Sequence, residues 1–138
     1  MTERTLPTED ALVAVMVAVS VSDENIRTAE LLKIEQIVNN LPVFASFDAD
    51  RTRDVASLVF ELFEDEDGLD ALFALVTDAV PERLYETAYA IACDVAAADG
   101  TLRQTELRFL EELRHALEID RLNAAAIERG ARARHMTL

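Results

Sequence analysis

The fold of this chain is decided by the stretch AIACDVAAADGTLRQTELRFLEEL, residues 90–113. It aligns without a gap to AVMVAVSVSDENIRTAELLKIEQI, residues 14–37, so that the two copies are offset by 76 positions. Each copy has an apolar segment, an acidic turn and a second segment whose apolar residues recur every three or four positions. The identical matched pairs are Asp23 with Asp99, Arg27 with Arg103, Glu30 with Glu106, Leu31 with Leu107, and Glu35 with Glu111. We therefore predict a duplicated helical hairpin.

The same apolar spacing predicts seven short helices, at about 9–21, 26–40, 49–65, 69–79, 81–98, 102–117 and 121–133. The 138 residues include only three glycines and three prolines, which favours helices over sheets. We predict a single domain, residues 1–138, with an all-α fold: a compact bundle of about seven helices containing the duplicated hairpin in pseudo-twofold packing. The first and fifth helices are expected to be the most buried. The predicted core includes Val15, Val19, Leu31, Ile34, Ile91 and Val95.

The chain is strongly acidic, with a formal net charge of −14. Such a protein repels nucleic acid and anionic lipid, which are bound through clustered lysine and arginine. The expected partners are therefore a divalent cation, a basic protein surface or a second copy of the chain, and not nucleic acid. Residues 121–138 differ, because they hold four arginines and one glutamate. Their end, residues 130–138, is expected to be a frayed tail that folding does not require.

The only cysteine, Cys93, falls on an apolar helix face and is expected to be a buried, unreactive thiol. A chain with one cysteine forms no internal disulfide, which suits a reducing compartment. The N-terminus lacks a signal-peptide pattern, and the apolar run at 11–21 is too short to span a bilayer. We expect a cytoplasmic protein without membrane insertion, with His115 and His135 at its surface.

The acidic turn of the second copy, DGTL at residues 99–102, resembles the later half of an EF-hand loop. Val95 and Ala97 stand where an EF-hand needs earlier oxygen ligands, so a true EF-hand is excluded. What remains in each turn is a pair of carboxylates seven positions apart. If the copies pack about a twofold axis, four carboxylates meet at one end of the bundle: Asp23, Glu30, Asp99 and Glu106.

Four converging carboxylates repel one another unless a cation lies between them or some hold protons. Ligands that are all oxygens favour Ca²⁺, Mg²⁺ or Mn²⁺ over Zn²⁺. A purely structural alternative stays open on the residues alone. Carboxylates are stabilised near a helix N-terminus, and Thr101 with Gln104 is typical of a capping box. Arg27 and Arg103 are also spaced to pair with the glutamates three positions later.

The pattern DGxLxxxEL at residues 99–107, between an apolar helix and one ending near LEID at 117–120, resembles the TerB-like tellurite-resistance family. The resemblance covers about residues 10–130. It implies a small all-helical domain built around paired acidic turns that bind metal ions, with ligands at Asp23, Glu30, Asp99 and Glu106. Glu24 stands where the second copy has Gly100, so the first site is expected to be weaker. The family also implies a binding or scaffold role in stress response.

The leading functional hypothesis is therefore a cytoplasmic, non-catalytic metal-binding or metal-sensing module of a tellurite-resistance or general stress-response system. The alternative is a metal-independent adaptor whose acidic surface docks a basic protein partner. The dense acidic run at residues 61–70 is typical of a solvated helix end. An enzyme is not expected, because the sequence shows no Ser-His or Cys-His arrangement, phosphate-binding glycine loop or histidine-rich metal motif.

Overall fold

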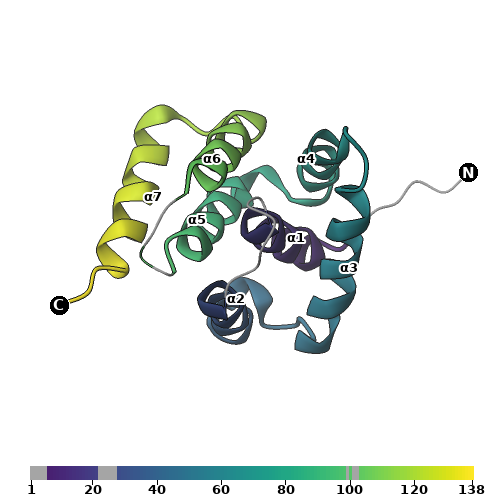
Figure 1. Ribbon diagram of the computed structural model, residues 1–138, viewed down its shortest axis with the longest axis horizontal. Helices are drawn as coiled ribbons and strands as arrows, with labels where there is room; N and C mark the ends of the chain where they lie inside the picture. Colours follow the sequence, from purple (N-terminus) through teal and green to yellow (C-terminus); the bar gives the residue numbers. More distant parts are fainter. Residues whose placement is uncertain (1–5, 22–27, 99, 101–102) are drawn as a thin grey trace, which may run out of the picture.

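The computed structural model describes residues 6–21, 28–98, 100 and 103–138. Within these residues the regular structure is entirely helical (Figure 1). Three 3-10 turns accompany the α-helices: η1 (Pro42–Phe44), η2 (Ala49–Arg51) and η3 (Glu82–Leu84). The α-helices are α1 (Thr8–Val21), α2 (Thr28–Asn40), α3 (Thr52–Leu62), α4 (Gly68–Ala79), α5 (Tyr85–Ala96), α6 (Gln104–Ala116) and α7 (Arg121–Arg134). The predicted all-α fold of seven helices is confirmed.

Helix α1 lies at the centre of the bundle, where α2, α3, α4, α5 and α6 all pack against it (Figure 1). Every residue from Ala11 to Val19 is at most 2% exposed, because a helix that is apolar on all faces has to be surrounded. Asp10, in the first turn, is also buried, and its carboxylate pairs with the guanidinium of Arg51. In that pair Arg51 Nε donates to Asp10 Oδ1 at 3.2 Å.

None of the helices within the described ranges combines the length and the apolar character that a membrane crossing requires.

The two copies of the repeat form two helical hairpins, α1–α2 and α5–α6. Helices α2 and α6 both contain 13 residues and begin at matched positions, Thr28 and Gln104. Helix α1 packs on α5, and each of them also contacts the second helix of the other hairpin. This reciprocal packing agrees with a duplicated hairpin, while the pseudo-twofold axis itself stays a prediction. The core residues predicted for the first helices are buried: Val15, Val19, Ile91 and Val95.

Helices α3 and α4 lie between the two hairpins in sequence and pack against α1. The helix predicted at about 49–65 is shorter than expected, because η2 precedes it and α3 ends at Leu62. Asp48 begins η2 by accepting the N–H of Asp50 at 3.0 Å. The turn into α4 requires glycine at position 68, since a Cβ atom there would lie 2.2 Å from the carbonyl oxygen of Leu62.

Helix α7 packs along α5 and ends at Arg134, one residue beyond the predicted end at about 133. Ala131 is 3% exposed, and Arg134 Nη2 donates to Asp94 Oδ1 of α5 at 2.7 Å. His135 is half-buried, with its Nδ1 2.7 Å from the carbonyl oxygen of Ala131. The expectation of a frayed tail over 130–138 and a surface His135 is therefore wrong, because residues 130–134 complete a docked helix. His115 is exposed, as predicted.

Candidate functional site

Two buried glutamates occupy the same place in the two hairpins. Glu30 is the third residue of α2 and Glu106 the third residue of α6, and each is 1% exposed. The residues that follow them, Leu31 and Leu107, are 46% and 43% exposed. The prediction of Leu31 as a core residue is therefore wrong. Each helix turns its first-turn carboxylate inward and the next leucine outward.

The carboxylate of Glu106 folds back on the start of its own helix. The N–H of Arg103 donates to Glu106 Oε1 at 3.2 Å, which is the glutamate half of a capping box. Helix α6 begins at Gln104, so Arg103 is the N-cap residue. The capping box expected from Thr101 and Gln104 stays a prediction, although the helix begins about two residues later than expected. Thr101 itself lies outside the described residues.

Burying two carboxylates is unfavourable unless hydrogen bonds or opposite charges offset the lost hydration. The first helical turn supplies part of this offset through its N–H groups and the positive end of the helix dipole. A carboxylate has about four lone-pair sites, and the Arg103 N–H uses one of those on Glu106. Anionic oxygen donors of this kind fit a hard cation such as Ca²⁺, Mg²⁺ or Mn²⁺.

The other two predicted ligands, Asp23 and Asp99, lie outside the described residues, as does Arg27. Across the described parts of the chain, no three His, Cys, Asp or Glu side chains are grouped so as to hold a metal ion. Glu30 and Glu106 stand near the starts of helices that both pack on α1 and α5. The meeting of all four carboxylates at one site therefore stays a prediction.

Residues 9–129 match a protein family described as tellurite resistance protein TerB. The chain belongs to the TerB family. The match runs from α1 into α7 and includes both hairpins, so the resemblance inferred from the acidic turns is confirmed. No curated protein and no solved structure matches this TerB-family chain.

Sequence reasoning missed the polar pairs that join α5 to α7 in this TerB-family protein. The hydroxyl of Tyr89 donates to Glu128 Oε2 at 2.5 Å, and Asp94 accepts from Arg134. Burial, together with the hydrogen bond to Glu128, raises the pKa of Tyr89 well above its ordinary value. The paired residues lie 39 and 40 positions apart. The only signal in the sequence was the polar residues on a helix that is otherwise mainly apolar.

Proposed function

We propose that this TerB-family chain is a cytoplasmic, non-catalytic module that binds a divalent cation within a tellurite-resistance or general stress-response system. Glu30 and Glu106 would hold the cation together with Asp23 and Asp99, and the cation would neutralise the carboxylates. The absence of catalysis is part of the proposal and rests on the sequence, which lacks a recognisable nucleophile–base pattern.

The burial of Glu30 and Glu106 at equivalent positions is the observation that carries this proposal. Helix capping alone does not require a buried carboxylate, since most first-turn glutamates satisfy N–H groups while facing water. Here both copies of the repeat place the glutamate inside and a leucine outside. A cation bound by the acidic turns gives a physical reason for this arrangement, because it offsets the cost of removing the charges from water.

Thermal melts and calorimetric titrations with Ca²⁺ and Mn²⁺ test the proposal. An ion that binds only the folded protein stabilises it by about 2.7 kcal/mol when present at 100 times its Kd. We expect the parent protein to show this rise and the double variant Glu30→Gln, Glu106→Gln to lose it. The substitution keeps side-chain shape while removing two charges, so the ion-free variant should remain folded.

The repeat supplies a matched control in Glu35 and Glu111, which are exposed on the same two helices. The variant Glu35→Gln, Glu111→Gln removes the same charge and should keep the full response to the cation. A parent protein whose melting midpoint ignores millimolar Ca²⁺ and Mn²⁺ would contradict the metal-binding proposal. Equal losses in both double variants would show only general attraction of cations to an acidic surface.

A metal-independent adaptor is the second candidate, and the corner between α3 and α4 favours it. Phe60 at this corner is 48% exposed. The acidic residues beside it are also exposed: Glu61, Glu64, Asp65, Glu66, Asp67 and Asp70. An aromatic side chain next to a charged run is suited to docking a basic partner. If the protein is an adaptor, its melting midpoint should not respond to Ca²⁺ or Mn²⁺. It should instead bind a lysine-rich peptide in a salt-sensitive way, and the double variant Glu64→Gln, Glu66→Gln should bind that peptide more weakly.

A further inference from the structure

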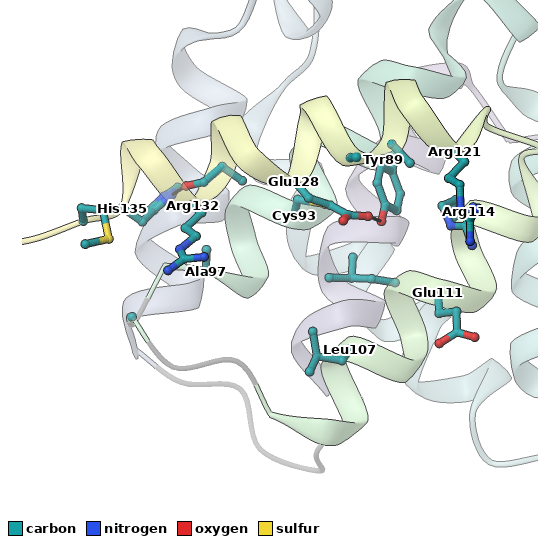
Figure 2. A pocket seen from close by; sticks show the side chains of 16 residues that line it. Tyr89, Cys93, Ala97, Leu107, Glu111, Arg114, Arg121, Glu128, Arg132 and His135 are labelled. Atoms are coloured by element: carbon teal, nitrogen blue, oxygen red, sulfur yellow. Dashed lines mark hydrogen bonds between the residues drawn. The ribbon is translucent and has the colours of Figure 1, made fainter.

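Side chains of α5, α6 and α7, together with Gly100 of the second acidic turn, line an open groove with a volume of about 830 Å³ (Figure 2). This volume lies within the range of roughly 300–1,000 Å³ typical of small-molecule sites. Helices α6 and α7 form opposite walls, and α5 contributes Tyr89 and Cys93 between them. Neither Glu30 nor Glu106 lines the groove, so a ligand bound there would not contact these two proposed cation ligands.

Most side chains in the middle of the groove are apolar, but Glu128 of α7 also lines it, and its carboxylate accepts a hydrogen bond from the Tyr89 hydroxyl at 2.5 Å. Leu107 and Leu110 come from α6, and Ala124 and Ala131 come from α7. Cys93 adds a thiol whose pKa is raised to about 12 by burial, so it is neutral at physiological pH. Along α7 the lining extends from Arg121 past Ala131, a helical length of roughly 15 Å. An elongated apolar body fits this surface better than a bare inorganic ion.

One end of the groove carries two arginines on either side of the α6–α7 connection. Arg114 and Arg121 both line it there, while Arg132 and His135 line the other end (Figure 2). Within the described residues, neither Arg114 nor Arg121 forms an ion pair with a carboxylate, although Glu111 lines the same wall.

In contrast, Arg51 and Arg134 are both paired with acids. Among the residues that line the groove, the three arginines Arg114, Arg121 and Arg132 outnumber the two glutamates Glu111 and Glu128, although the whole chain has a net charge of −14. The groove therefore has a local preference for an anion at the end where Arg114 and Arg121 lie.

We propose that this groove binds a monomeric anionic amphiphile, a small molecule with one carboxylate headgroup and an extended apolar body. Arg114 and Arg121 bind the headgroup, because the guanidinium fork matches a carboxylate with two parallel hydrogen bonds. The apolar body lies along Leu110 and Ala124 towards Ala131. This activity goes beyond the proposed cation binding and does not depend on it.

The free molecule is favoured over a membrane surface on electrostatic grounds. A body with a net charge of −14 is repelled by an anionic bilayer, whereas a single small anion meets only the local charge of the groove. Helices α6 and α7 form side walls that can enclose a single apolar chain. A bilayer is a flat, extended surface and would gain little from such walls. The occupant is therefore a dissolved amphiphile rather than a bilayer.

Calorimetric titration of the full chain with dodecanoate, below its micelle-forming concentration, tests the proposal. We expect saturable one-to-one binding, weakened about tenfold or more in the variant Arg114→Gln, Arg121→Gln. The matched control is Arg108→Gln, Arg129→Gln, which removes two exposed charges from the same two helices outside the groove and should keep the parent affinity. Ala125→Trp, which fills the groove from an exposed position, should abolish binding while its melting curve confirms folding.

Three results would overturn the proposal. Equal weakening by both arginine pairs would show that only net charge matters. Binding of dodecyltrimethylammonium as tight as that of dodecanoate would show detergent-like adsorption without a headgroup site. Failure of the parent to bind dodecanoate, whether or not it binds phosphatidylglycerol vesicles, would exclude a site for the dissolved amphiphile.

Discussion

Burial of the Cys93 thiol on α5 shows how the position of one residue sets its chemistry. Its side chain is 4% exposed, and desolvation raises its pKa from 9.0 to about 12 because the thiolate loses hydration. The thiol is thus protonated at neutral pH. The expectation of a buried cysteine is confirmed, and its low reactivity follows from the scarcity of thiolate.

This raised pKa predicts a specific loss of stability at alkaline pH. The folded state holds the proton more tightly than the unfolded state, so its contribution is complete below about pH 9 and declines as pH rises towards 12. Between pH 9 and 10 the free energy of unfolding should fall by about 1 kcal/mol from this group. Urea unfolding of the parent and of Cys93→Ala measures this loss. The variant should show a shallower decline, because it keeps only the contribution of Tyr89, whose pKa is also raised. An identical slope in both proteins would contradict the assignment.

At the scale of single elements, α7 is the helix whose role the structure changes most. Deleting residues 130–138 removes the buried Ala131 and the hydrogen bonds from Arg134 to Asp94. We expect a loss of about 1–3 kcal/mol in the free energy of unfolding, since the ion pair is largely exposed and the rest is apolar burial. Thermal and urea unfolding measure the effect.

A shorter deletion provides the control for this prediction. Removing residues 136–138, which are exposed and follow the end of α7, leaves the helix intact and should barely change the melting midpoint. Equal stability of the parent and the 130–138 deletion would show that the contacts of the last turn contribute nothing measurable.

For the whole molecule, the packing of the two hairpins through α1 and α5 predicts one cooperative unit. Ile91 is 1% exposed on α5, and Ile91→Ala should cost about 2–5 kcal/mol because it removes buried methyl groups and leaves a cavity. Leu122→Ala, at a residue 76% exposed, should change stability by no more than about 0.5 kcal/mol. Calorimetry should give equal calorimetric and van't Hoff enthalpies for both proteins. Two separate transitions would contradict a single domain.

Local periodicity was sufficient to predict the helices and the central place of α1. A segment such as Ala11–Val19 has no polar face in any register, so its burial follows from its own residues. The repeat with an offset of 76 residues likewise predicted two helical hairpins. The matched first residues and equal lengths of α2 and α6 agree with this prediction. The TerB family was recognisable from the same stretch, because the acidic turns are contiguous in sequence.

Only the tertiary structure decided which side of each helix faces inward at its ends. Glu30 and Glu106 are buried, while the adjacent leucines are exposed. Hydrophobic patterning predicts the opposite, with the leucines buried and the glutamates exposed. The docking of α7, the Asp10–Arg51 pair and the groove beside Tyr89 join residues that are distant in the chain. Helical propensity is set within a few residues of sequence, whereas these contacts depend on how whole helices are positioned against one another.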